Sequence, residues 1–211
     1  MSLLLCYITD RHHFPGDEIS RSRLLLEKIT KAARCGVDFI QLREKDLAIC
    51  DLEILARRAV ETIHNNRGAG NTRLLINSRS DVAVACGADG VHLRVDDISP
   101  SEVRNIWKKA DVTIGVSCHS VEEISRAAKA NAMFTVFGPV FEKVSMAGIQ
   151  PIGLEMLVAA CWQKIPVLAL GGVNLKNASL CMTAGAAGVA GIRLFQEGDL
   201  EETVRKLRGL A

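Results

Sequence analysis

The chain lacks the sequence features of several protein classes. Its seven cysteines are odd in number and form no Cys-x-x-Cys pair, so neither a disulfide framework nor a zinc site is expected. Its 26 basic and 24 acidic side chains nearly balance and give no basic surface for nucleic acid or an anionic membrane. The apolar run at its start is too short for a signal peptide or a membrane span. We therefore expect a cytoplasmic protein with neither nucleic acid nor a membrane as partner.

Eight short apolar runs, each followed by an amphipathic stretch, fill the 211 residues. The runs predict strands at 3–9, 39–42, 73–77, 90–93, 112–116, 133–137, 167–170 and 188–192. The amphipathic stretches predict helices at 19–35, 49–66, 79–86, 99–109, 120–130, 153–162, 174–184 and 199–209. Such alternation predicts a parallel sheet, and eight repeats favour a closed (β/α)8 TIM barrel, an α/β fold, over an open sheet. We expect one TIM-barrel domain over residues 1–211.

The main alternative fold, a Rossmann-like sheet, would carry a glycine fingerprint in its first βα turn. That turn, residues 9–17, has no such pattern. Residues 138–150 form the longest stretch without a predicted element, too long for a tight turn, and are predicted to form an active-site flap.

The most informative segment follows the second predicted strand. Gln41, Arg43 and Lys45 alternate there, so their side chains point the same way. Two cations aimed at one small volume are unfavourable in a core but favourable for phosphate, pyrophosphate or carboxylate. The segment therefore predicts a site for a small anionic ligand.

Two glycine-bearing turns follow the last two predicted strands. They contain Gly171 and Gly172 in one turn and Gly191, Ile192 and Arg193 in the other. Glycine lets backbone N–H groups approach an anion closely, and TIM barrels often bind phosphate after strands 7 and 8. The pair of turns predicts a phosphate site.

Other polar residues come at the ends of strands three to five. Asn77 and Ser117 would open on the same face as the anion site. His119 follows the fifth strand and is a candidate for proton transfer, or else a histidine at a helix start bonded to a carbonyl. His92, inside a strand, is interpreted as a satisfied barrel residue. Asp97, beside Asp96, could bind a divalent cation or serve as a helix cap.

The order of several motifs resembles the thiamine phosphate synthase/TenI superfamily across nearly the whole chain. They are Tyr7-Ile8-Thr9-Asp10, Gln41-Leu42-Arg43-Glu44-Lys45, Leu75-Ile76-Asn77, Ala88-Asp89-Gly90-Val91-His92-Leu93, Gly115-Val116-Ser117-Cys118-His119-Ser120, Phe137-Gly138-Pro139-Val140-Phe141 and Gly171-Gly172-Val173. The resemblance implies one of two activities. Synthases join an aminopyrimidine pyrophosphate to a thiazole phosphate with magnesium, and TenI-like tautomerases isomerise the thiazole phosphate carboxylate without an essential metal.

The resemblance also implies roles for individual residues. Arg43, Lys45, Asn77 and Gln41 would face pyrophosphate; Gly172, Ile192 and Ser145 in the flap would face the thiazole phosphate; Asp97 matches one magnesium ligand; and His119 matches the tautomerase histidine. A homodimer is what other small barrels suggest.

Three positions depart from the synthase pattern. Ser78 stands where synthases typically carry a second metal-binding Asp, Arg94-Val95 replaces Gly-Gln, and Met146 replaces a lysine expected on the leaving group. These losses should weaken pyrophosphate expulsion most, so the chemistry favours a thiazole tautomerase that needs no cofactor. The alternatives are a divergent Mg²⁺-dependent synthase in which Arg94, Lys143 or Arg193 restores the lost charge, and a non-catalytic barrel that binds thiazole or thiamine phosphate. A sugar-phosphate isomerase ranks last.

Overall fold

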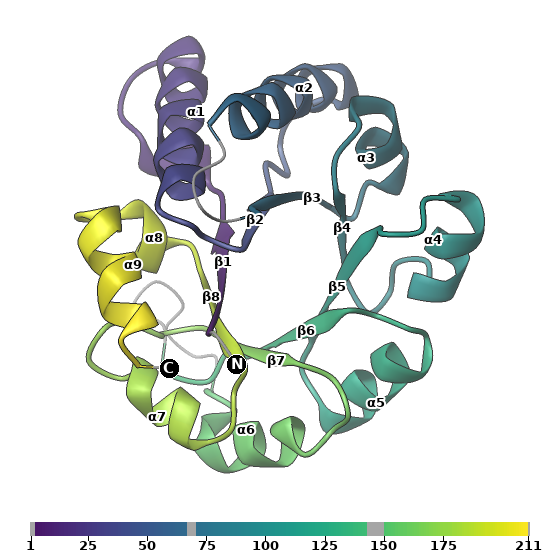
Figure 1. Cartoon of the computed structure of the whole chain (residues 1–211), viewed down its shortest axis with the longest axis vertical. Helices are drawn as coiled ribbons and strands as arrows, with labels where there is room; N and C mark the ends of the chain where they lie inside the picture. Colours follow the sequence, from purple (N-terminus) through teal and green to yellow (C-terminus); the bar gives the residue numbers. More distant parts are fainter. Residues whose placement is uncertain (1–2, 67–70, 143–149, 211) are drawn as a thin grey trace.

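The computed structural model describes residues 3–66, 71–142 and 150–210, and in these residues eight parallel strands close into a barrel (Figure 1). The strands are β1 (Leu4–Ile8), β2 (Phe39–Leu42), β3 (Arg73–Asn77), β4 (Gly90–Leu93), β5 (Thr113–Cys118), β6 (Phe134–Phe137), β7 (Val167–Leu170) and β8 (Gly188–Gly191). Each pairs with its sequence neighbours, and β8 pairs with β1. The predicted TIM barrel is confirmed, and no predicted strand end is wrong by more than two residues.

Helices surround the barrel on all sides (Figure 1). They are α1 (Glu18–Arg34), α2 (Ile49–Asn65), α3 (Ser80–Cys86), α4 (Pro100–Ile106), α5 (Val121–Lys129), α6 (Gly153–Cys161), α7 (Ala178–Thr183), α8 (Arg193–Gln196) and α9 (Leu200–Arg208), with a 3-10 turn η1 (Arg11–His13). None of the helices in the described ranges is long and apolar enough to cross a membrane.

The sequence prediction missed two short elements and misplaced one helix start. Both η1 and α8 are too short to show a helical period. Helix α7 begins four residues later than predicted because asparagine side chains bond the local backbone. The Asn174 N–H donates to Asn177 Oδ1 over 2.8 Å, and the Lys176 N–H donates to Asn174 Oδ1 over 2.9 Å. Such local bonds compete with the helix and favour a turn.

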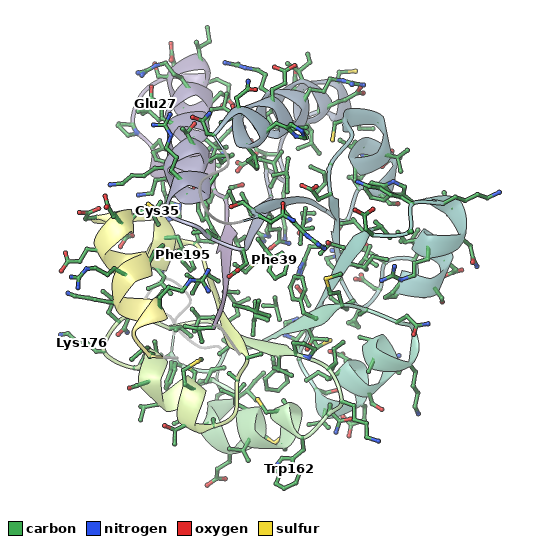
Figure 2. The ribbon with its side chains drawn as sticks, in the orientation of Figure 1. Glu27, Cys35, Phe39, Trp162, Lys176 and Phe195 are labelled. Atoms are coloured by element: carbon green, nitrogen blue, oxygen red, sulfur yellow. The ribbon has the colours of Figure 1, made fainter. Side chains whose placement is uncertain are left out.

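The barrel interior is filled by side chains from the strands. One buried cluster consists of Cys6, Ile8, Phe39, Leu75, Phe134, Val136, Leu168 and Ala190. The rings of Phe39 and Phe134 stack with centroids 4.5 Å apart, and Figure 2 shows Phe39 near the barrel centre. A Cβ at Gly115 would lie 2.5 Å from Phe134 Cζ and 2.6 Å from His92 Nδ1, so only glycine leaves room for both rings. These aromatic rings form a packed floor beneath the carboxyl ends of the strands.

The outward-facing strand residues pack beneath the helices in two further clusters. One lies under α1, α2, α3 and α9, and the other lies under α4, α5, α6 and part of α7. The two clusters cover the outer surface of the barrel, which leaves its carboxyl-end mouth as the place where polar strand ends meet.

The last helix joins the first part of the chain. Arg208 of α9 donates to the carbonyl oxygens of Leu3 and Gly36 and, over 2.9 Å, to Asp38 Oδ2. The same oxygen, Asp38 Oδ2, also accepts from the Leu5 N–H of β1 over 2.7 Å. Arg208 therefore ties α9 to the strand where the barrel closes.

Candidate active site

An amide pair lies at the carboxyl ends of β2 and β3. Gln41 is buried, and its Nε2 donates to Asn77 Oδ1 over 2.9 Å. Asn77 Nδ2 in turn donates to Ser78 Oγ over 3.2 Å. Ser78 has a positive φ of 59°, a conformation that costs a non-glycine residue energy and is concentrated at functional sites. The carboxyl ends of β2 and β3 are therefore joined by a side-chain hydrogen bond at the mouth of the barrel.

Two cations, Arg43 and Lys45, follow β2 at the mouth of the barrel. Neither Arg43 nor Lys45 forms an ion pair within the residues that the structure describes. The positive charge of Arg43, followed by burial and by the charge of Arg94, lowers the pKa of Lys45 below its usual value. The charges of Arg43 and Arg94 thus both act on the Lys45 ammonium. This is the electrostatic environment of an anion site.

Glu44, between these two cations, points the other way and is held by a network that the sequence analysis missed. Its side chain is 1% exposed and accepts from Thr9 Oγ1 over 2.5 Å and from the Arg11 N–H over 3.0 Å. The buried Arg11 guanidinium lies 3.2 Å from Glu44 and donates to Asp46 Oδ1 over 2.7 Å. The Arg43 N–H donates to Thr9 Oγ1 over 3.0 Å. The network therefore fixes the backbone that carries Arg43 and Lys45.

A signal for this network was present in the sequence. If Arg43 and Lys45 face the mouth, strand alternation directs Glu44 to the opposite side, where a buried carboxylate requires a cation. Strand β1 lies beside β2, and Arg11, in the turn that follows β1, was the nearest basic residue there.

His92 lies below the mouth and supports Ser117. It is 1% exposed, and its Nε2 lies 2.9 Å from Ser117 Oγ. Its Nδ1 has no hydrogen-bond partner in the described residues, so the interpretation of a fully satisfied barrel histidine was wrong for one of its two nitrogens. The ring also contacts Phe134, with centroids 5.9 Å apart. His92 therefore places the Ser117 hydroxyl above the aromatic floor.

His92 gives the fold a predicted dependence on pH. Burial lowers its pKa from 6.5 to about 4. The negative charge of Asp97 opposes this shift, and the positive charge of Arg43 adds to it. Between these values the unfolded chain binds a proton that the folded chain does not, so stability falls as the pH falls. The expected loss from pH 7.5 to pH 4.5 is about 2–3 kcal/mol.

Urea unfolding of the wild type and of His92→Gln at both pH values measures this loss. The wild type should lose about 2–3 kcal/mol more than the variant between the two pH values, since other groups titrate in both proteins. A His64→Gln control, at an exposed site, should behave as the wild type. Equal losses in wild type and His92→Gln would contradict a neutral buried imidazole.

His119 lies at the exposed end of β5. Its Nδ1 is 2.7 Å from the carbonyl oxygen of Gly138, which can only accept, so Nδ1 donates and in the neutral ring the lone pair is on Nε2. Its backbone N–H donates to Glu123 Oε2 over 2.6 Å. The carbonyl bond is the one expected of a histidine at a helix start, and it leaves Nε2 able to accept a proton. The catalytic role of His119 stays a prediction.

The glycine turn after β7 has a backbone shape suited to close approach. Gly171 and Gly172 have φ values of 92° and 66°, and a Cβ at Gly172 would lie 2.6 Å from the Glu142 carbonyl oxygen. Asn177 Nδ2 donates to the Gly172 carbonyl oxygen over 3.0 Å and holds the first turn. The second turn, at Gly191 and Ile192, leads into the short helix α8, which begins at Arg193. A short extra helix after strand 8 is the usual place of the phosphate site in TIM barrels.

The donor atoms at the end of β4 do not suit a magnesium ion. Arg94 contacts both carboxylates there, those of Asp96 and Asp97. Asp97 Oδ2 accepts from the Arg94 N–H over 2.7 Å, Asp97 Oδ1 lies 3.7 Å from Arg94 Nε, and Asp96 Oδ2 accepts from Arg94 Nη2 over 2.8 Å. The preceding strand, β3, is followed by the neutral hydroxyl of Ser78 in place of a carboxylate. Among the described residues, no group of three or more His, Cys, Asp or Glu side chains could hold a metal.

The predicted flap contains three residues with proposed or missing roles. Lys143, Ser145 and Met146 lie outside the described residues. The predicted contact of Ser145 with a thiazole phosphate and the predicted compensation by Lys143 therefore stay predictions.

Known proteins resemble this chain along nearly its whole length. The profile of the family described as "Thiamine monophosphate synthase" matches residues 5–195. A Geobacter sulfurreducens protein, provisionally named a thiamine-phosphate synthase, is 40% identical over 209 residues, covering 98% of this chain and 93% of the relative. A Syntrophomonas wolfei thiamine-phosphate synthase is 36% identical over 207 residues, covering 97% and 94%. The structure of a thiamine phosphate pyrophosphorylase from Pyrococcus furiosus has a TM-score of 0.80 and 28% identity, covering 99% of this chain and 95% of the other.

Proposed function

The chain belongs to the thiamine monophosphate synthase family, which acts in thiamine biosynthesis, and on that premise we propose that it is a thiamine-phosphate synthase. In the proposed reaction an aminopyrimidine pyrophosphate and a thiazole phosphate react at the barrel mouth. The bond from the pyrimidine-bearing carbon to the pyrophosphate oxygen breaks, pyrophosphate leaves with the electron pair, and the thiazole bonds to that carbon.

The observation that carries this proposal is the adjacent pair Arg43 and Lys45, which no described carboxylate neutralises. Negative charge grows on pyrophosphate as it leaves, and fixed cations that already face it lower the barrier without rearrangement. The Gln41 and Asn77 amides lie beside the pair and supply neutral hydrogen bonds to the same ligand.

The thiazole phosphate is proposed to bind at the turns after β7 and β8. There the backbone N–H groups of Gly171, Gly172, Gly191 and Ile192 can approach it, with Arg193 at the start of α8. The Ser117 hydroxyl, held by His92, is proposed to bond the polar edge of the aminopyrimidine. Synthases of this family use Mg²⁺ to add positive charge on pyrophosphate, but the donor atoms described after β4 in this chain do not fit that ion.

The departures at Ser78 and Met146 favour a thiazole tautomerase. The relatives give that activity no support, because they are named as synthases or as a pyrophosphorylase. The electrostatics also argue against it. A single carboxylate needs one cation, whereas three, Arg43, Lys45 and Arg94, follow strand ends at the same mouth of the barrel.

One assay tests the proposed function. Purified protein is incubated with aminopyrimidine pyrophosphate and thiazole phosphate, and pyrophosphate and the joined product are measured, both with Mg²⁺ and with EDTA. Equal amounts of pyrophosphate and product would support a synthase.

A parallel sample contains the thiazole phosphate carboxylate alone. Isomerisation there, lost in His119→Gln, with no pyrophosphate release in the first sample, would contradict the proposal and favour a tautomerase. Binding without turnover in either sample would favour a non-catalytic barrel.

A further inference from the structure

Arg94 occupies the position where a metal ion would be needed. In a magnesium site one or two carboxylates hold the ion and substrate phosphate oxygens complete its shell. Here the guanidinium of Arg94 and its backbone N–H engage both oxygens of Asp97, and the guanidinium also bonds Asp96. A dication at Asp97 would have to displace this pair and then lie beside a fixed positive charge.

The guanidinium of Arg94 lies against two carboxylates, as a bound metal cation would. Its two carboxylate contacts fix the guanidinium through Nε and Nη2, so Nη1 takes part in neither. The Asp97 side chain is 16% exposed and that of Arg94 is 54% exposed, so the guanidinium stays open to a ligand while its carboxylate partner is mostly buried. A guanidinium with remaining N–H groups matches the spacing of phosphate oxygens and donates to them directly.

Arg94 also lies at the same end of the barrel as the other two cations, because all three follow the carboxyl ends of parallel strands. Its charge acts on Lys45, and the charge of Arg43 acts on Lys45 more strongly. The three side chains come from the ends of two strands that β3 separates, β2 and β4. A ligand with several negative oxygens could therefore contact all three at once.

We propose that Arg94 replaces the divalent cation at this mouth and, together with Arg43 and Lys45, binds pyrophosphate without a metal. This inference rests on the proposed function for the identity of the ligand, but it concerns binding and not turnover. It explains why a chain with Ser78 in place of a second carboxylate also carries an arginine where the family has a glycine.

Calorimetric titration with inorganic pyrophosphate tests the inference. We expect wild-type protein to bind at least as tightly in EDTA as in Mg²⁺, since free magnesium sequesters pyrophosphate. Arg94→Gln should bind about tenfold or more weakly in EDTA, because one charge-assisted contact is lost. Arg58→Gln, which removes an exposed arginine on α2, should bind as the wild type. Thermal unfolding of each variant checks that it folds.

A second variant tests the link to the metal. Combining Ser78→Asp with Arg94→Gly provides two carboxylates without a competing guanidinium, and its pyrophosphate binding should become dependent on Mg²⁺. Wild-type binding only in Mg²⁺, or an unchanged affinity in Arg94→Gln, would overturn the inference. Metal-free binding through Arg94 in a protein that releases no pyrophosphate would refute the proposed function alone, and Mg²⁺-dependent binding in an active synthase would refute this inference alone.

Discussion

Arg43→Gln is expected to lower kcat/KM for pyrophosphate release by about 10²–10³-fold, the usual effect of losing one fixed group that stabilises charge in the transition state. Arg43 follows β2, its backbone is held by Thr9, and no described carboxylate neutralises it. Its guanidinium can donate two parallel bonds to phosphate oxygens, and glutamine cannot. Steady-state pyrophosphate release by wild type and variant measures the effect.

Two controls separate charge from geometry at position 43. Arg43→Lys keeps the charge but loses the planar fork, so its activity should lie between those of wild type and Arg43→Gln. Arg58→Gln changes an exposed arginine on the outer surface of α2 and should retain wild-type activity. If Arg43→Gln keeps full activity while the wild type is an active synthase, pyrophosphate does not leave at the end of β2.

Arg11→Met is expected to lower the free energy of unfolding by about 3–5 kcal/mol, the cost of removing one partner from a buried ion pair. Burial already raises the pKa of Glu44 above its usual value, even though Thr9 and Arg11 bond its carboxylate. Without the guanidinium, this carboxylate must be buried without a counter-charge or take up a proton. Urea unfolding at neutral pH gives the loss directly.

The surface provides the matched control for Arg11. Arg23 pairs with Glu27 over 2.6 Å, and both side chains are more than half exposed. Arg23→Met should change stability by about 0.5 kcal/mol or less, because exposed pairs contribute little. Adding Glu44→Gln to Arg11→Met should recover part of the loss, since a neutral amide is less costly to bury than a carboxylate. A loss in Arg11→Met no larger than that in Arg23→Met would show that the network is not a stabilising one.

The fold could be predicted from sequence because every strand of the barrel is a short apolar run between polar or glycine residues. The run at Phe39–Leu42 was predicted to the residue, since all four of its residues are buried and only Gln41, near its carboxyl end, is polar. The start of α7 could not be predicted, because bonds between asparagine side chains and nearby backbone, and not hydrophobic periodicity, decide where that helix begins.

The candidate site was predictable only where strand geometry determines it. Alternation along one strand predicts Arg43 and Lys45 on a common side, and that placement stays a prediction. The contact of Arg94 with Asp97 depends on side-chain conformation within a loop, and the bond between His92 and Ser117 depends on the register of β4 against β5. Neither follows from spacing along the chain.

The closure of the barrel at β1 and β8 also has a consequence for synthesis on the ribosome. Strand β1 is among the first segments to emerge, yet its partner β8 and the Arg208 contact of α9 come from the other end of the chain. At usual translation rates the interval is on the order of ten seconds or more, far longer than a hairpin or helix takes to form. During that time β1 presents one unpaired edge, so the nascent chain is open to wrong pairing until its last elements appear.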